Sequence, residues 1–358
     1  MGKQYNNKQL LNLKRLIKTF ISLFKSNNYQ IDYFLTILKK IKYTLNIKQY
    51  YINKNIILLI INIYLTYEEK LKENNCIDFD DMINKCTEII KSSHIIPKWK
   101  YIIVDEYQDT SLTKFYLLET LINKTKANFL AVGDDFQSIY RFTGCDLHIF
   151  LNFTKYFKDS HIYKIVNTYR NPQELINIAG NFIMKNKRQL KKQLISNKHI
   201  NNPIIIYKTN NYIKTLKDIL LTINESDIFV LGRNNNDINK YIDNTYNKKD
   251  NEYTFNNITF KYLTIHRSKG LEANNVILIN LEDNILGFPS KIKDEKILKY
   301  ILPKKEKCKY AEERRLFYVG ITRTKNETYL LANKKKPSLF VRELVNYDSK
   351  SIKIIDLW

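Results

Sequence analysis

The sequence predicts an α/β fold preceded by a helical region. From Asn7 to about Glu73, apolar residues recur every three or four positions, which is typical of amphipathic helices. After about residue 95, short β-rich runs alternate with helical patterns, which is typical of parallel strands covered on both faces. The 358 residues, 44% of them apolar, are enough for two domains with sizeable cores.

The N-terminal region is predicted to form several helices with a basic solvent-facing side. One helical face carries the apolar residues, and lysines lie between them; the apolar positions are Leu10, Leu13, Ile17, Ile21 and Phe24. The basic side is either a solvated surface or a surface that contacts DNA, and the pattern leaves both interpretations open.

Eight apolar runs predict the strands of the α/β region. They are Tyr101–Val104, Phe129–Val132, Ile162–Val166, Ile204–Tyr207, Ile228–Leu231, Phe260–Ile265, Val276–Leu281 and Tyr329–Ala332. In such sheets, ligands bind beyond the carboxyl ends of the strands. The stretch from Asn234 to Asn257, rich in Asn, Asp, Lys and Tyr, is instead expected to form a mobile surface loop.

Composition narrows the range of partners. Lys and Arg number 59 against 36 Asp and Glu, and this net charge of +23 suggests a polyanion such as nucleic acid. Adenine- and thymine-rich codons also enrich Lys, Ile, Asn and Tyr, so the charge permits nucleic-acid binding without proving it. The four cysteines form no CxxC pair, which argues against a disulfide framework and a zinc site. With no long apolar span and no secretory signal pattern, we expect a cytoplasmic protein, associated with the nucleoid or its viral equivalent.

The first candidate site follows the predicted strand Tyr101–Val104. This strand leads directly into Asp105 and Glu106, and a carboxylate at a strand end can hold Mg²⁺ through water. The neighbouring Glu106 can orient and deprotonate an attacking water. Two carboxylates after an apolar strand form a Walker B pattern. The pattern alone is common by chance, but its continuation into Gln108-Asp109 is less so.

The next predicted strand also ends in carboxylates, Asp134 and Asp135. Before them, Gly133 is expected to let the backbone turn sharply, and after them the amide of Gln137 can sense a phosphate. Two aromatic residues, Tyr140 and Phe142, follow beside a basic residue, which suits stacking on the bases of a single strand. Such a pair more often belongs to a core, but here it follows about 30 residues after the first acidic strand end.

Five segments, in this order, resemble motifs II to VI of superfamily 1 helicases of the UvrD/Rep type. They are Asp-Glu-Tyr-Gln-Asp-Thr (105–110), Val-Gly-Asp-Asp-Phe-Gln-Ser-Ile-Tyr (132–140), Thr-Tyr-Arg-Asn (168–171), Thr-Ile-His-Arg-Ser-Lys-Gly-Leu-Glu (264–272) and Glu-Glu-Arg-Arg-Leu-Phe-Tyr-Val-Gly-Ile-Thr-Arg (312–323). Four further segments resemble the helicase IV branch, namely 140–147, Gln189-Leu-Lys-Lys192, Gly287-Phe-Pro289 and Pro337-Ser-Leu-Phe340. The resemblance covers most of residues 75–345.

The resemblance implies two RecA-like P-loop NTPase domains, of which the first is incomplete, with a helical N-terminal subdomain. Residues 1–75 would form the helical subdomain, an insertion of the first RecA-like domain. Residues 76–158 would be the C-terminal part of that domain, with motifs II and III. Residues 159–358 would form the second RecA-like domain, with motifs IV to VI. The implied activity is an ATP-dependent DNA helicase or translocase that moves 3′ to 5′ on single-stranded or partly duplex DNA.

The resemblance also implies a role for each matching residue, with ATP and Mg²⁺ as cofactors. In hydrolysis, Asp105 would ligand Mg²⁺, Glu106 would activate water, Gln137 and Arg170 would contact the γ-phosphate, and Arg323 would be the arginine finger. In nucleotide binding, Tyr169 would stack on the adenine and Glu272 would accept from the ribose hydroxyl, with Gly270 nearby. On DNA, Tyr140 and Phe142 would stack on bases, and Thr264 and His266 would touch the backbone of the tracking strand. Outside this motif, a residue like His266 would more often be a core or surface histidine.

The chain departs from the family in one motif. Nothing resembles Gly-x-x-x-x-Gly-Lys-Thr, and the only Gly-Lys is Gly2-Lys3, with no preceding strand. We expect the phosphate-binding loop to come before the first residue of this chain. Three explanations stay open: an upstream-encoded polypeptide that supplies the loop in trans, a truncated reading frame, or a degenerate protein that keeps only DNA binding.

Three functions follow from these patterns. The first is a helicase or translocase in which this chain supplies motifs II to VI. The second is a single-strand-binding protein that does not hydrolyse ATP, which would account for the missing loop and the charge. The third, a metal-dependent nuclease built on Asp105, Glu106, Asp134 and Asp135, leaves the Gln137 and Arg323 patterns unexplained.

Overall fold

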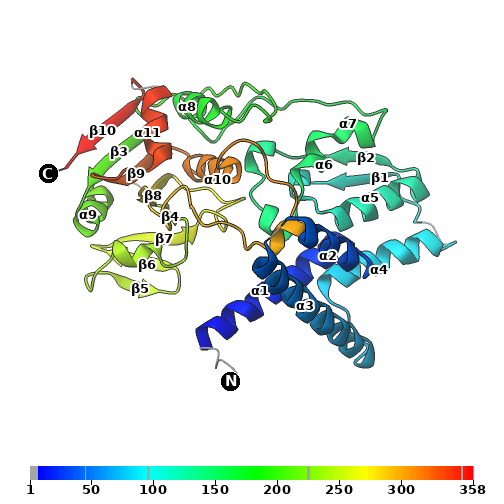
Figure 1. Cartoon of the computed structure of the whole chain (residues 1–358). Coiled ribbons are helices and arrows are strands. Elements are labelled where there is room, and N and C mark those ends of the chain that lie inside the picture. Colours follow the sequence, from blue (N-terminus) through cyan, green and yellow to red (C-terminus); the bar gives the residue numbers. More distant parts are fainter. Residues whose placement is uncertain (1–6, 45, 95–96, 224–225, 348–349, 358) are drawn as a thin grey trace. The chain divides into compact units, whose positions relative to one another are not determined.

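The computed structural model describes residues 7–44, 46–94, 97–223, 226–347 and 350–357, without side-chain detail for residues 42–44. The chain folds into two compact units (Figure 1). Unit 1 contains the residues up to Asp134, then Tyr140–Lys158 and Lys293–Lys305. Unit 2 contains Asp135–Ile139, Asp159–Ile292 and the residues from Glu306 onward. The predicted division into three domains stays a prediction, but the two short segments at 135–139 and 293–305 show that the compact units are not contiguous in sequence.

The predicted helical region forms four helices of unit 1. They are α1 (Asn7–Ser26), α2 (Tyr33–Thr44), α3 (Ile47–Glu73) and α4 (Phe79–Ser92). The first three enclose an aromatic core, in which the rings of Phe24 and Phe34 stack with centroids 4.4 Å apart. Ile297 and Ile301, on either side of a short 3₁₀ turn in the segment 293–305, complete this core. The capping box of Asp78 and Asp81 fixes the start of α4, since each side chain accepts from the other's backbone N–H.

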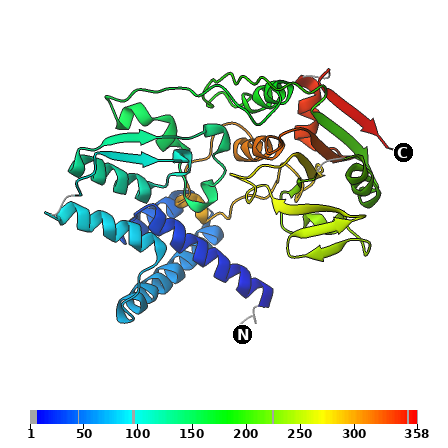
Figure 2. The ribbon, with the colours of Figure 1, turned by 180° about the vertical axis from the view of Figure 1, so that it is seen from behind.

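A two-stranded parallel sheet forms the second part of unit 1 (Figure 2). It pairs β1 (Tyr101–Val104) with β2 (Asn128–Ala131), and the accompanying helices are α5 (Leu112–Thr125), α6 (Leu147–Leu151) and α7 (Phe153–Tyr156). Ile102 and Val104 point to the covered face, where they pack with α5 and Phe129. On the other face, Tyr101 and Ile103 keep 69% and 68% of their surface exposed.

Unit 2 is built on an eight-stranded sheet in the order β10-β3-β9-β8-β4-β7-β6-β5. Its strands are β3 (Ile204–Thr209), β4 (Ile228–Gly232), β5 (Asn247–Lys249), β6 (Glu252–Phe255), β7 (Ile258–Thr264), β8 (Asn275–Leu281), β9 (Thr328–Asn333) and β10 (Ile352–Asp356). All neighbouring strands are parallel except at β5 and β6, which pair antiparallel with each other and with β7. The α/β class predicted from the sequence is therefore confirmed.

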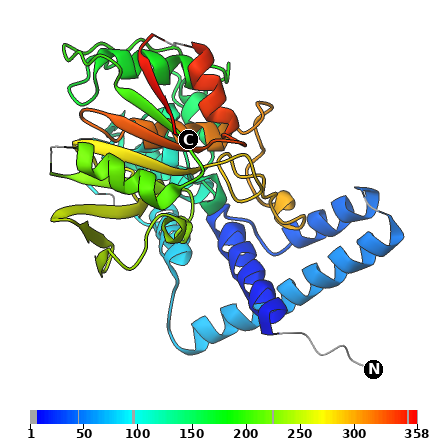
Figure 3. The same cartoon turned by 90° about the vertical axis from the view of Figure 1, so that its left-hand side faces the viewer.

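Helices cover both faces of this sheet (Figure 3). The helices are α8 (Gln173–Ile183), α9 (Tyr212–Thr222), α10 (Ala311–Ile321) and α11 (Leu339–Tyr347). On one face, Leu216 and Ile219 of α9 pack with Ile277 and its neighbours. The alternate residue Leu278 points to the other face, where it meets α10 at Gly320. Such double coverage explains why most of these strands read as continuous apolar runs.

Two sequence-based predictions about strands and loops were wrong. The run 162–166 forms no strand; Ile162, Tyr163 and Ile165 are between 62% and 87% exposed, and only one bridge joins the next residue, Asn167, to Ile195. An apolar run without a neighbouring ladder remains an extended segment. The stretch 234–257 is not an irregular loop, because it contains a 3₁₀ turn, β5 and β6.

The reason for the second error is a set of buried aromatic residues that the polar composition concealed. Tyr241, Tyr246, Tyr253 and Phe255 belong to the core formed with α9 and β7. Strand β10 was not predicted, because its apolar run is short and is interrupted by Lys353. None of the helices in the described ranges is long and apolar enough to cross a lipid bilayer.

Candidate functional site

In unit 1, the carboxylates predicted at the first strand end lie directly after β1. Asp105 and Glu106 are both exposed, and the Glu106 backbone N–H donates to Asp105 Oδ1 at 2.8 Å. Glu106 has a left-handed backbone with φ of 51°, which a non-glycine residue adopts only at a cost of the order of 1 kcal/mol. Such strain is common at functional sites, and here it directs the carboxylate out of the strand end.

Gln108 joins the ends of β1 and β2. Its side chain is fully buried, its Nε2 donates to Glu106 Oε2, and its Oε1 accepts from the Asp134 backbone N–H at 2.9 Å. The sequence drew attention to Gln108 only as part of a motif. The structure shows that this amide orients Glu106 while it fixes the neighbouring strand end.

Gly133 is required at this place for space and not for a turn. The structure has no turn or bend at Gly133, contrary to the sharp turn expected from the sequence, and its φ is outside the left-handed region. A Cβ on Gly133 would lie 2.5 Å from Gln108 Oε1 and 2.8 Å from Phe150 Cε2, closer than real Cβ contacts come. The missing side chain therefore lets Gln108 approach the backbone of the second strand end.

The donor chemistry at this strand end fits a divalent cation. Asp105 and Glu106 offer exposed carboxylate oxygens, which are the ligands that Mg²⁺ prefers. A nuclease would also need Asp135, but this carboxylate belongs to unit 2, where its Oδ1 lies 2.7 Å from Lys192 Nζ. Asp135 is also completely buried, so it does not offer an exposed carboxylate to a metal ion.

The aromatic pair predicted to contact DNA also belongs to unit 1. The rings of Tyr140 and Phe142 meet edge to face, with centroids 6.1 Å apart, and half of Phe142 is exposed. Burial, together with the carboxylates of Asp109 and Glu106, raises the pKa of Tyr140, so its hydroxyl stays protonated near neutral pH. Between them, Arg141 pairs with Asp294 at 2.7 Å and donates to the carbonyl of Pro303.

In unit 2, two of the predicted nucleotide-binding residues bind each other. Arg170 Nε donates to Glu272 Oε2 at 2.6 Å, and Lys325 lies 3.2 Å from the other carboxylate oxygen. Arg170 and Lys325 lower the pKa of Glu272, which therefore stays ionised. Tyr169, next to Arg170, is 89% exposed, so its ring face can accept a planar ligand.

Two further predicted residues, Arg323 and Gln137, also meet in unit 2. Arg323 is only 2% exposed, and its Nη2 donates to Gln137 Oε1 at 3.1 Å. Its Nε donates to the Val319 carbonyl at 3.2 Å, which ties the guanidinium to the end of α10. Lys269 Nζ donates to the Gln137 carbonyl at 3.0 Å. Gln137 is therefore held at both its side chain and its backbone.

The predicted DNA-contacting residues of unit 2 follow β7. Thr264 ends this strand, and its carbonyl accepts from the backbone N–H groups of Arg267 and Ser268, which begins a turn that contains His266. The same turn leads to Gly270, whose φ of 82° is in the left-handed region. Burial and the neighbouring Arg233 lower the pKa of His266 to about 4. Arg233 follows the adjacent strand β4 and forms a double hydrogen bond with Glu313 of α10.

Asn171 supports this site, although the sequence analysis gave it no role. It is 7% exposed, and its amide donates to the carbonyls of Thr322 and Thr324 at 3.1 and 2.7 Å. These bonds fasten the segment with Tyr169 and Arg170 to the residues on either side of Arg323. The only signal in the sequence was that Asn171 is the last residue of the motif Thr-Tyr-Arg-Asn (168–171).

The structure thus divides the predicted site residues between the two units. Unit 1 holds Asp105, Glu106, Tyr140 and Phe142, and unit 2 holds Gln137, Tyr169, Arg170, Thr264, His266, Gly270, Glu272 and Arg323. Within the units, direct contacts join Tyr140 with Phe142, Arg170 with Glu272, and Arg323 with Gln137.

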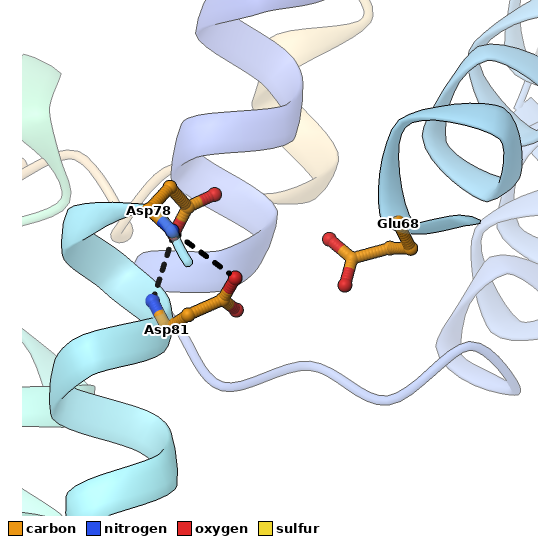
Figure 4. Close-up of side chains that lie close together, drawn as sticks. All are labelled: Glu68, Asp78 and Asp81. Carbon is orange, nitrogen blue, oxygen red and sulfur yellow. Dashed lines mark hydrogen bonds between the residues drawn. The ribbon is translucent and has the colours of Figure 1, made fainter. Parts of the chain in front are cut away.

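A separate acidic cluster in unit 1 was not predicted (Figure 4). Glu68 of α3 faces Asp78 and Asp81 at the start of α4, with carboxylate oxygens within 4.8 Å of one another. The ammonium of Lys25, a residue only 4% exposed, lies 2.7 Å from Glu68 and Asp78 and 2.8 Å from Asp81. Burial lowers the pKa of Lys25, but the hydrogen bonds with the three carboxylates raise it more, so the residue is a cation. This cluster is therefore a structural ion-pair network.

Comparisons with known proteins agree with the motifs. The model of the UvrD/REP helicase N-terminal domain matches residues 2–158, and that of the UvrD-like helicase C-terminal domain matches residues 247–335. DNA helicase IV of Escherichia coli is 32% identical over 281 residues, which cover 78% of this chain and 40% of that protein. The ATP-dependent DNA helicase PcrA of Bacillus subtilis is 31% identical over 158 residues, which cover 42% of this chain and 21% of the relative.

The length of the relatives exceeds that of this chain. A probable DNA helicase II homolog of Mycoplasma capricolum matches 48% of this chain at 30% identity, but only 26% of its own length. The chain spans less than half the length of these three relatives. Among solved structures, that of PRRSV helicase aligns with 69% of this chain at 14% identity, with a TM-score of 0.33, which adds nothing to the family assignment.

Proposed function

Because the chain belongs to the UvrD/Rep family of superfamily 1 DNA helicases, we propose that it supplies motifs II to VI of an ATP-dependent helicase or translocase that moves 3′ to 5′ on single-stranded DNA. The observation that carries this proposal is the organised pair of clusters at Glu106 and Arg323. Two glutamine amides hold these groups: the buried Gln108 binds Glu106, and the partly buried Gln137 binds Arg323. A protein that only binds DNA has no need of either arrangement.

Glu106 is the proposed general base for the attacking water. Its carboxylate is exposed, and the hydrogen bond from Gln108 restricts its rotation, which lowers the entropy cost of positioning the water. Asp105 would hold Mg²⁺. When bound, this cation would neutralise part of the negative charge of the phosphates. Arg323 and Arg170 would neutralise the charge that develops on the γ-phosphate as the phosphoanhydride breaks.

The remaining residues of unit 2 would bind the nucleoside of ATP. The exposed ring of Tyr169 suits stacking on adenine. Glu272, kept ionised by Arg170 and Lys325, can accept a hydrogen bond from a ribose hydroxyl. Gly270 lies in the turn that follows β7, and its left-handed φ disfavours most other residues. This position of the turn therefore has no side chain.

Single-stranded DNA would be held by aromatic stacking and by contacts to its backbone. Phe142 and Tyr140 offer ring faces and edges for bases, each worth about 1–3 kcal/mol. Thr264 and His266 would donate to phosphates of the tracking strand. The net charge of +23 favours such a ligand, and we place the protein in the cytoplasm, at the nucleoid or its viral equivalent.

The Walker A loop would come from a further polypeptide segment, whether encoded upstream or belonging to a longer chain. The uncovered face of the two-stranded sheet supports this part of the proposal. Tyr101, Ile103 and Leu130 are 69%, 68% and 54% exposed there, although parallel sheets are normally covered on both faces. A segment that adds strands and helices to this sheet would complete a first RecA-like domain.

The test is DNA-stimulated ATP hydrolysis by the chain, measured with and without a segment that carries the Walker A loop. We expect turnover only in the combined preparation. Glu106→Gln should lower kcat by about a hundredfold or more while ATP still binds. The matched control is Glu69→Gln, at an exposed position of α3, which should leave kcat unchanged. No turnover in any combination would refute the enzymatic proposal.

The second candidate function is a single-strand-binding protein without hydrolysis, favoured by the absence of a Gly-Lys-Thr loop in this sequence. It predicts salt-sensitive DNA binding that neither ATP nor Glu106→Gln alters. An ATP-dependent change in DNA affinity of the combined preparation would exclude it.

A further inference from the structure

The segment Asp135–Ile139 has a singular position in the chain. Its neighbours on both sides, Asp134 and Tyr140, belong to unit 1, but the five residues themselves belong to unit 2. Gln137, the proposed phosphate contact, is the middle residue. What holds this segment to unit 2 therefore determines where Gln137 lies.

The first anchor is the carboxylate of Asp135, which is completely buried. Its Oδ1 lies 2.7 Å from Lys192 Nζ, and its Oδ2 accepts from Gln189 Nε2 at 2.9 Å and from the Leu190 backbone N–H at 2.8 Å. A buried carboxylate without such partners would be strongly unfavourable. Gln189, Leu190 and Lys192 thus bind both carboxylate oxygens of Asp135.

The second anchor consists of the residues on either side of Gln137. The ammonium of Lys192 lies 4.0 Å from the ring centroid of Phe136, and this ring meets Tyr318 of α10 edge to face at 5.3 Å. On the other side, Arg315 Nε donates to the Ser138 carbonyl at 2.6 Å. Arg315 is 2% exposed and is itself held by Glu306 and Gln189.

We propose that residues Gln189–Lys192, together with Arg315, form a clamp that positions Gln137 for the nucleotide. Lys192 and Arg315 are positioning residues that act through Asp135 and Ser138 and are not proposed to touch the nucleotide. With both neighbours fixed, the contacts of Arg323 with Gln137 Oε1 and of Lys269 with its carbonyl set the direction of the amide. Residues 135–139 are covalently joined to residues of unit 1 at both ends. The clamp keeps them in unit 2, because their release would expose the buried ion pair of Asp135 and Lys192.

This inference deepens the proposed function and rests on it for the role of Gln137, whereas the clamp itself can be tested in the chain alone. The first arm compares wild type with Lys192→Met, Lys192→Arg and the exposed neighbour Lys191→Met by hydrogen–deuterium exchange. We expect the amides of 135–139 to exchange at least about tenfold faster in Lys192→Met, and the strands of unit 2 to be unchanged. Lys192→Arg should restore most of the protection, and Lys191→Met should behave as wild type.

The second arm measures ATP hydrolysis in the combined preparation. Lys192→Met should lower kcat by about tenfold or more with less than about a threefold change in KM for ATP, because the contact made by Gln137 strengthens at the transition state. Unchanged exchange in Lys192→Met would overturn the clamp, and faster exchange with unchanged kcat would overturn its positioning role. If even the wild type shows no turnover, the helicase proposal fails alone, and the exchange arm still decides the clamp.

Discussion

His266 lies next to Arg233, and its burial and this neighbouring cation together lower its pKa to about 4. The imidazole is therefore neutral at pH 7, where an exposed histidine would be partly protonated. The proposed contact with the DNA backbone must accordingly use a ring N–H as an uncharged donor. The positive charge at this place comes from Arg233, which Glu313 holds at the end of β4.

The depressed pKa of His266 predicts a pH-dependent stability. Between pH 6.5 and 4 the unfolded chain binds the proton that the folded chain excludes, so the contribution of neutral His266 is complete above pH 6.5 and is lost as the pH falls towards 4. His266→Gln should make the free energy of unfolding depend less on pH in this window, as measured by denaturant unfolding at pH 7, 6 and 5. The exposed His161→Gln is the control. An unchanged pH profile in His266→Gln would contradict the lowered pKa of this partly buried histidine.

The residue types at the candidate site could be predicted from motifs, but their contacts could not. Asp105 and Glu106 were identified because an apolar run precedes two carboxylates. Gln108 acts through an amide that reaches the end of a second strand, and sequence spacing contains no information on that distance. For the same reason, the need for Gly133 was attributed to a turn, whereas the structure attributes it to the approach of Gln108.

Among the secondary structure elements, apolar runs predicted seven strands because those strands are buried on both faces or lie in a parallel ladder. The run 162–166 has similar composition but lacks a partner strand, and pairing depends on residues far away in the sequence. Strand β6 was missed since its polar residues alternate with the buried Tyr253 and Phe255, which a composition-based interpretation averages out, and β5 consists of three exposed polar residues. The helical region was predictable because its periodicity is local.

The ion-pair network of Lys25 joins α1, α3 and α4 and gives a prediction at this scale. Lys25→Met would leave the carboxylates of Glu68, Asp78 and Asp81 without their shared cation. We expect the free energy of unfolding to fall by about 3 kcal/mol. This is the lower limit of the loss that is typical when a buried ion pair is broken, because Glu68 is 35% and Asp78 is 23% exposed.

Denaturant unfolding measures this loss, and Lys18→Met, at an exposed position of the same helix, is the matched control. That variant should change the free energy of unfolding by about 0.5 kcal/mol at most. Equal stabilities of the two variants would show that the network contributes nothing. Adding Asp81→Asn to Lys25→Met should recover part of the loss, because it removes one of the mutually repelling charges.

For the whole molecule, the two units differ in how completely their sheets are covered. The eight-stranded sheet of unit 2 has helices on both faces, whereas the two-stranded sheet of unit 1 exposes Tyr101, Ile103 and Leu130. Of the four residues on the exposed side of these strands, only Asn128 is polar, and the residues on the covered side are all apolar. This composition is typical of strands that are buried on both faces. It favours a further protein segment, and not solvent, on the exposed face of this sheet.

The last prediction concerns this exposed face. Ile103→Asp combined with Leu130→Asp should leave the chain folded, because both side chains point away from its own core. The same variant should bind a Walker A-bearing segment at least about a hundredfold more weakly, since burying each apolar side chain contributes about 1.5–3 kcal/mol. Binding is measured by titration calorimetry and folding by thermal melting. Ile165→Asp, at an 80% exposed apolar position of unit 2, is the control that should bind normally. Undiminished binding by the double variant would show that the completing segment docks elsewhere, and the face of β1 and β2 would then need another explanation.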